Sequence, residues 1–101
     1  MTIVIGYYEV DPDSRADFIA ARHERMRYSL AHEGCEEFAF CADPLNAGRV
    51  ILIERWTSRA LLNRHLELSR AENTEPLLPG PIKPPEIVFY EIAGEEPYTS
   101  R

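Results

Sequence analysis

The 101-residue sequence contains almost no lysine: Lys83 is the only one, and the 11 basic residues face 17 acidic ones for a net charge of −6. A nucleic-acid binder needs clustered lysine and arginine for phosphate contacts, so this balance argues against one. No apolar run approaches the roughly 18 residues of a membrane span. The apolar residues 1–5 have neither a basic region nor a small-residue cleavage site. We therefore expect a cytoplasmic protein that binds neither nucleic acid nor membrane.

Cysteine is also scarce, with only Cys35 and Cys41. If both lie on one extended strand, their Cα atoms are about 20 Å apart. A disulfide requires Cα atoms within about 7 Å, so we expect two buried, reduced thiols.

Sequence motifs for metal or nucleotide binding are missing as well. There is no CxxC, no HExxH, no phosphate loop and no GxGxxG. His23 and His32 are nine residues apart, so on one helix they would point to opposite sides and could not share a metal ion. We expect no metal site.

The sequence does have the composition of a folded domain, with 45% apolar and 28% charged residues. Its length suits one domain, and we place the core at about residues 2–93 with a frayed tail at 94–101. A domain this short has a thin core, which association with a second copy would enlarge.

The order of predicted elements is β-α-β-β-α-β. Strands are expected at residues 3–10, 36–42, 49–56 and 86–92, and helices from Asp13 or Ser14 to about residue 32 and at about 59–70. Either Asp13 or Ser14 would cap the first helix, and Gly34 would end it. This order is the split βαβ arrangement, an α+β ferredoxin-like fold with one antiparallel sheet and both helices on one face. The inner face of the first helix is expected to carry Ile19, Arg22 or His23, Met26 and Leu30.

The predicted strands are apolar on both faces. In the third strand, for example, Val50 and Leu52 oppose Ile51 and Ile53. A strand with one face in water should instead alternate apolar and polar residues. No segment of the chain remains to cover the second face, because residues 76–85 form a short proline-rich loop. We therefore expect a homodimer with a two-fold axis, in which the two sheets pack together.

Chemistry-bearing side chains gather around the end of the third strand. Glu54 and Trp56 share one face of it, and the following helix would bring His65 back over the sheet. A histidine near its usual pKa can transfer a proton at neutral pH. Each residue also has a structural interpretation, since Glu54 could anchor loop N–H groups, Trp56 could be core, and His65 could be a packing histidine. Tyr7, Tyr8 and Tyr90 fit a ligand-binding wall and a plain core equally well.

The segment 49–68 resembles the antibiotic biosynthesis monooxygenase family of dimeric α/β barrels. The matching residues are Glu54-x-Trp56, the polar cap Thr57-Ser58, then Ala60-Leu61 and His65-Leu66. Glu33-Gly34-Cys35 resembles that family's lead into its second strand, and the turn at 43–48 also fits. The resemblance covers about residues 2–93. It implies a ferredoxin-like protomer that pairs through its sheet, with a pocket in each protomer.

Some members of that family oxidise hydroquinones or polycyclic phenols with O₂ and use no metal or flavin. The resemblance thus implies a monooxygenase without cofactor that acts on a small phenolic or quinol-type aromatic. His65 would be the base or a hydrogen-bond partner, with Glu54 beside it, and Trp56 would shape the pocket. Tyr7, Asn63 or Tyr90 would bind the substrate.

Haem degradation is disfavoured, because the family members that degrade haem carry a tryptophan where His65 stands and a histidine near the position of Glu75. Two other functions stay open. The chain could also be a non-oxidative binding protein, isomerase or lyase of the same fold. It could finally be a structural dimer in which Glu54 and His65 are merely paired.

Overall fold

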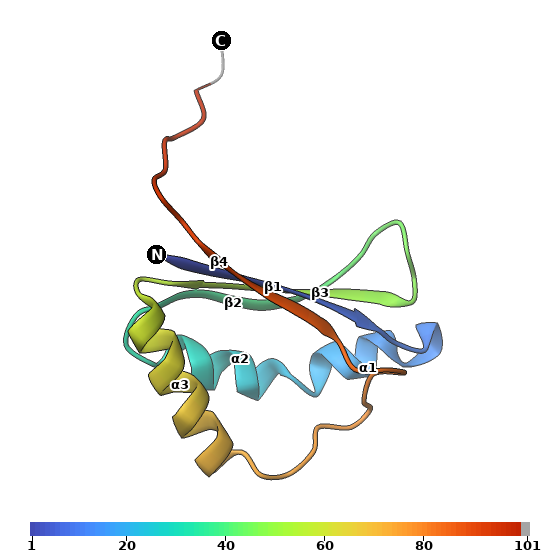
Figure 1. Ribbon diagram of the computed structural model, residues 1–101. Helices are drawn as coiled ribbons and strands as arrows, with labels where there is room; N and C mark the ends of the chain where they lie inside the picture. The colour runs from blue at the N-terminus through green and yellow to red at the C-terminus, as the bar shows by residue number, and fades with distance from the viewer. Residues whose placement is uncertain (100–101) are drawn as a thin grey trace.

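Four strands form one antiparallel sheet in the computed structural model, which describes residues 1–99. The strand order is β2-β3-β1-β4, with bounds β1 Thr2–Glu9, β2 Cys35–Ala42, β3 Arg49–Trp56 and β4 Glu86–Glu91. The helices are the 3₁₀ turn η1 Pro12–Ser14, α1 Arg15–Ala20, α2 His23–Leu30 and α3 Arg59–Glu72. All helices lie on one side of the sheet, and the other sheet face is bare (Figure 1). The predicted α+β ferredoxin-like fold is therefore confirmed. Ser100 and Arg101, the end of the predicted tail, lie outside the described residues.

The first predicted helix is in fact two helices, broken at Ala21 and Arg22. The Arg22 amide donates to the carbonyl of Ile19 at 3.0 Å, three residues back rather than four. The Phe18 carbonyl is thereby freed and accepts Nη1 of the Arg22 side chain at 2.9 Å. A side chain has replaced a backbone donor, which explains why the helix breaks here.

Two details of that prediction were wrong. Neither Asp13 nor Ser14 caps the segment, because Asp11 accepts the Asp13 amide at 2.9 Å and the Ser14 side chain accepts no capping bond. Leu30 is 45% exposed, and Ser29 takes the buried position instead. The break rotates the second half of the segment, so that a periodicity counted over one continuous helix no longer holds.

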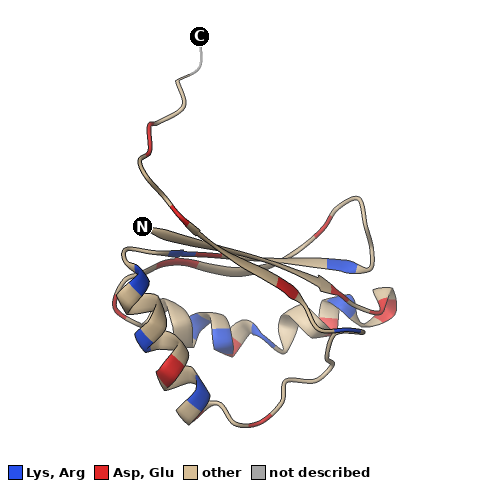
Figure 2. Ribbon diagram, in the orientation of Figure 1, with Lys and Arg blue, Asp and Glu red and all other residues tan. Residues whose placement is uncertain are grey.

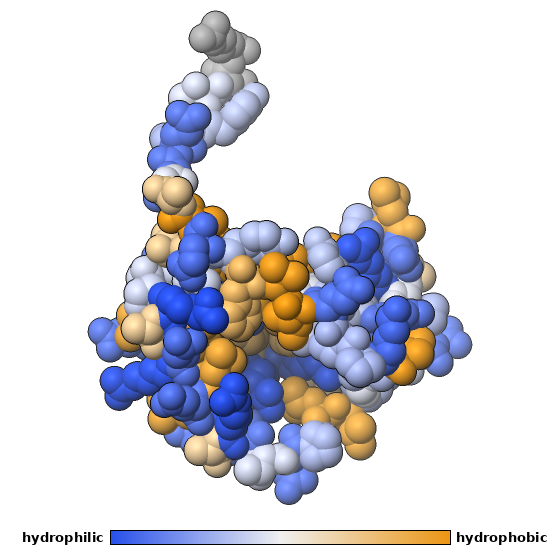
Figure 3. Space-filling view, in the orientation of Figure 1, coloured by the Kyte–Doolittle hydropathy of each residue, from blue (hydrophilic) through white to orange (hydrophobic). Residues whose placement is uncertain are grey.

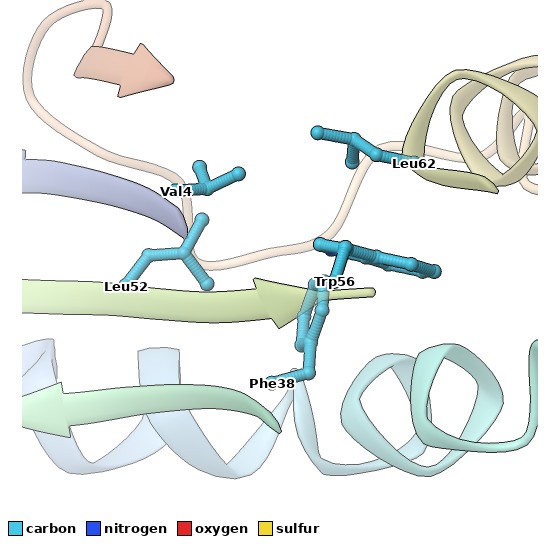
Figure 4. Close-up of a cluster of buried hydrophobic side chains, with 5 residues drawn as sticks. All are labelled: Val4, Phe38, Leu52, Trp56 and Leu62. Carbon is cyan, nitrogen blue, oxygen red and sulfur yellow. The ribbon is translucent and has the colours of Figure 1, made fainter. Parts of the chain in front are cut away.

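The core lies between the sheet and the helices. Its main cluster joins β1, β2 and β3 to α3 through Val4, Phe38, Leu52, Trp56 and Leu62 (Figure 4). A smaller cluster of Val10, Phe18 and Val50 packs against the other end of the sheet.

The side of the sheet away from the helices is apolar, as predicted. Ile53, Val88 and Tyr90 are 37%, 46% and 49% exposed there, while Val4, Leu52 and Trp56 on the opposite face are at most 4% exposed. Charges of both signs are spread over the helices (Figure 2). No helix among residues 1–99 has the length and apolar character needed to cross a membrane.

Two local features position the rest of the chain. Gly34 has φ +87°, and a Cβ there would lie 2.5 Å from Cδ1 of Leu61, so only glycine makes the turn into β2 without strain. Residues 73–85 pass beneath the sheet from α3 back to β4 without forming a helix or strand, as predicted for the proline-rich part (Figure 1). The two cysteines both lie in β2 and are not joined, as predicted. The expectation that both thiols are buried was wrong, because Cys35 is only half-buried and Cys41, opposite Ile51, is exposed.

Candidate functional site

A cavity of about 390 Å³ lies between the sheet and the helices. Its sheet wall is Tyr8 from β1 and Phe40 from β2, and its helix wall is Arg22 and Arg25. Residues 73–77, which follow α3, form its rim. The space-filling view shows a hollow beneath the sheet (Figure 3). Its volume suits a small organic molecule.

Arg22 is the most unusual residue of this cavity, because it is a guanidinium that is only 6% exposed. It stacks on Phe18, with Cζ 3.4 Å from the ring centroid. Its Nη1 donates to the carbonyls of Phe18 at 2.9 Å and Pro79 at 3.1 Å, and so fastens the proline-rich loop to the helix layer. Burial lowers the pKa of Arg22, but arginine stays protonated in proteins.

Tyr8 faces Arg22 from the sheet. Its ring packs against Phe18 and Phe40, with centroids 5.5 and 5.6 Å away. Burial raises the pKa of the Tyr8 hydroxyl, the charge of Arg22 lowers it, and the charge of Glu54 raises it. The phenol is therefore a neutral hydrogen-bond donor at neutral pH.

Glu54 and Trp56 interact directly, as their shared strand face predicts. Trp56 Nε1 donates to Glu54 Oε1 at 2.9 Å. Trp56 is 0% exposed and Glu54 is 7% exposed. Burial raises the pKa of Glu54, while the hydrogen bond from Trp56 lowers it. The carboxyl group is thus held in the core by one indole N–H.

His65 lies on the other side of Trp56, with the ring centroids 4.7 Å apart. It is 5% exposed, and its Nδ1 is 2.7 Å from Nδ1 of His32. Burial and then the charges of His32 and Arg25 lower the pKa of His65 to about 4, so it is neutral at pH 7. It borders a crevice of about 150 Å³ between the end of α2 and α3 rather than the 390 Å³ cavity.

The sequence model of the antibiotic biosynthesis monooxygenase family matches residues 1–74. The chain belongs to this family. An uncharacterized protein of Synechocystis sp. is 30% identical over 95 residues, which are 90% of this chain and 63% of that protein. The chain thus spans less than two thirds of the length of this curated relative.

Solved structures of the family share the fold at low sequence identity. The haem degrader MhuD of Mycobacterium tuberculosis, solved with two haems in its active site, superposes with a TM-score of 0.75 at 12% identity, covering 96% of this chain and 100% of that one. The monooxygenase ActVA-Orf6 of Streptomyces coelicolor, solved with nanaomycin D, gives 0.68 at 20% identity, covering 97% and 92%. The family therefore includes monooxygenases and haem-degrading enzymes, and these two likenesses show the fold alone.

The family resemblance named six site residues, and the structure brings three of them together. Glu54, Trp56 and His65 form a continuous buried chain. Tyr7 and Tyr90 are 39% and 49% exposed on the open side of the sheet.

Asn63 lies elsewhere, on the exposed side of α3, where its Oδ1 accepts Nε of Arg59 at 3.1 Å. It therefore borders neither the 390 Å³ cavity nor the His65 crevice.

Tyr7 borders a depression of about 700 Å³ at one end of the sheet. Several polar groups of this depression already have partners. Lys83 Nζ pairs with Glu9 at 3.2 Å, and the Gly48 amide donates to Asn46 at 3.0 Å. We therefore take the smaller cavity, with Tyr8 and Arg22, as the candidate ligand site.

Sequence reasoning missed His32, and it named Tyr8 and Arg22 without assigning them to a site. Signals for two of them existed. Tyr8 alternates with Val4 and Val10 on β1, and Arg22 was a polar member of a predicted inner helix face. Nothing in the sequence pairs His32 with His65, because 33 residues separate them.

Proposed function

We propose that this chain is a cofactor-independent monooxygenase that oxidises a phenolic or quinol-type aromatic with O₂. The observation that carries the proposal is the cavity under the sheet, where two arginines face an aromatic wall of Tyr8 and Phe40. For a hydroquinone the reaction would give a hydroxyquinone and water, with one oxygen atom going to each product. The four electrons come from the substrate, so no external reductant is needed.

The physical logic concerns the substrate's ionisation. Triplet O₂ reacts slowly with closed-shell molecules unless they donate one electron, and a phenolate does so more readily than a phenol. The positive charges of Arg22 and Arg25 favour the ionised form and so lower the pKa of a bound phenol. A cavity beneath the sheet would also limit water around reduced oxygen.

In this proposal His65, Trp56 and Glu54 support the cavity from behind. With a pKa of about 4, His65 is a weak base at neutral pH and better suited to be a neutral hydrogen-bond partner. Glu54 links this group to the cavity, because its charge acts on the Tyr8 hydroxyl.

The test is O₂ uptake with a panel of hydroquinones and naphthols. We expect His65→Ala to reduce turnover and His23→Ala, an exposed histidine in the first turn of α2, to leave it unchanged. Unchanged turnover in His65→Ala would remove His65 from the mechanism. If the wild-type protein takes up no O₂ with any substrate of the panel, the proposed monooxygenase reaction is contradicted.

A second candidate function is non-oxidative ligand binding. The observation in its favour is that His65, the best proton acceptor by residue type, does not border the cavity and is a weak base. This function predicts thermal stabilisation by aromatic ligands without O₂ consumption.

We also propose that the open sheet face is a homodimer interface. The exposed Ile53, Val88 and Tyr90 support this, because burying such apolar surface contributes about 25 cal/mol per Å². Val88→Glu should yield a monomer in sedimentation at micromolar concentration. Leu45→Glu, at a loop residue that is 96% exposed, should not. A wild-type monomer under these conditions would exclude this interface.

A further inference from the structure

The cavity contains hydrogen-bond donors that nothing in the described chain satisfies. Nη1 of Arg22 makes both of this side chain's hydrogen bonds, to the carbonyls of Phe18 and Pro79. Among residues 1–99, its Nε and Nη2 have no acceptor. In the same part of the chain, no buried side-chain nitrogen or oxygen lacks a partner. These two groups are therefore accessible, and Arg22 borders the 390 Å³ cavity.

The charge of Arg22 is also unbalanced. The ion pairs of the described residues join other cations to carboxylates, namely Arg27, Arg49, Arg55, Arg59 and Lys83. Arg25 adds a second positive charge to the same wall. On the negative side, Glu75 stands exposed at the rim, and Glu54 lies in the core beyond Tyr8.

An arginine that is only 6% exposed normally has an anionic partner, because removing a charge from water is costly unless it is paired. The guanidinium edge formed by Nε and Nη2 offers two parallel N–H donors, which match the two oxygens of a carboxylate. The Tyr8 hydroxyl also has no hydrogen-bond partner among residues 1–99 and borders the same cavity. Phe40 and Leu77 supply apolar surface beside these groups.

We propose that the ligand of this cavity is an aromatic carboxylate, held by Arg22 through its carboxylate and by Tyr8 through a hydrogen bond. The inference deepens the proposed function by naming the substrate class, and it rests on the same cavity. It adds a second role for Arg22. The side chain that binds the ligand also holds the proline-rich loop, through its hydrogen bond to the Pro79 carbonyl.

The test compares 2-naphthoate with 2-naphthamide, which have the same ring system and differ in charge. Binding to the wild-type protein is measured by calorimetry without O₂. We expect the naphthoate to bind at least about tenfold more tightly, as the loss of a charge-assisted hydrogen bond implies. In Arg22→Met this preference should vanish. The control Arg27→Met, at an exposed arginine of α2 that pairs with Glu24, should keep it.

Equal binding of the two compounds by the wild-type protein would overturn the inference, and so would an undiminished preference in folded Arg22→Met. If Arg22→Met does not fold, Tyr8→Phe and Arg25→Met replace it, and each should reduce the preference for naphthoate. An unreduced preference in both variants would refute the site.

The outcome of this test is separable from that of the proposed function. If the protein prefers naphthoate but takes up no O₂ with any hydroquinone, this inference stands and the monooxygenase proposal is rejected. If it turns over neutral hydroquinones but does not prefer naphthoate, the monooxygenase proposal stands and this inference is rejected.

Discussion

Replacing Trp56 with phenylalanine should destabilise the protein in a pH-dependent way. The substitution removes the only hydrogen bond that the Glu54 carboxyl group accepts among residues 1–99. It also leaves a small void, since Trp56 is fully buried. A hydrogen bond to a charged group contributes about 1.5–3 kcal/mol, whereas a neutral one contributes about 0.5–1.5 kcal/mol. The loss should therefore be larger when Glu54 is ionised.

The sign follows from the raised pKa of Glu54. The folded state holds this proton more tightly than the unfolded state does. The contribution of Glu54 to the free energy of unfolding is therefore greatest below its ordinary pKa of 4.5 and falls as the pH rises through the raised folded value. Trp56 partly offsets this loss, because its hydrogen bond favours the ionised form.

The assay is a double-mutant cycle of Trp56→Phe and Glu54→Met, which removes the acceptor at similar size, measured by urea denaturation at pH 4 and pH 8. The cycle cancels the void and the titration of all other groups. We expect a coupling free energy of about 1.5–3 kcal/mol at pH 8 and about 1 kcal/mol or less at pH 4. For a domain of this size, 2 kcal/mol corresponds to a shift in Tm of roughly 8–16 °C. The same coupling at both pH values would refute an ionisable Glu54 bonded to Trp56.

Three further predictions concern the histidine pair and the turn before β2. His32→Ala should raise the pKa of His65 above about 4 in an NMR titration, because it removes a nearby positive charge, while His23→Ala should not change it. Since the pKa of His65 is lowered on folding, stability should fall as the pH decreases from about 6.5 to about 4, and His65→Gln should weaken this dependence. Gly34→Ala should lower the free energy of unfolding by at least about 1 kcal/mol, because its φ is +87° and Leu61 leaves no room, whereas Gly94→Ala should have no effect. Equal stabilities of the two alanine variants would contradict the strain argument.

Local chemistry explains why most elements could be predicted. The apolar run at 50–53 predicted β3 with its observed bounds, and Ser58 caps α3 by accepting the Leu61 amide at 3.2 Å. The break at Arg22 could not be predicted in the same way. It depends on a side-chain hydrogen bond to Phe18 and on the Pro79 carbonyl, which comes from a loop 57 residues later.

The candidate site was only partly accessible to sequence reasoning. Glu54 and Trp56 are two residues apart on one strand, so their contact follows from strand geometry. From the sequence alone, Tyr7 and Tyr8 are equally good candidates for a ligand-binding wall. The sheet decides between them, because Tyr7 shares the open side with Ile5 and Tyr8 shares the cavity side with Val4.

The sequence by itself determined the order of strands and helices, the split βαβ fold and the two apolar sides of the sheet, because these depend on periodicity and turn residues that act over a few positions. Only the tertiary structure decided which polar groups meet. The contacts of His32 with His65, and of Arg22 with Tyr8 and Pro79, join segments separated by 14 to 57 residues. Such contacts depend on the rotation of each helix about its own axis where it packs against the sheet. A helix break placed at the wrong residue changes this rotation and therefore changes which side chains meet.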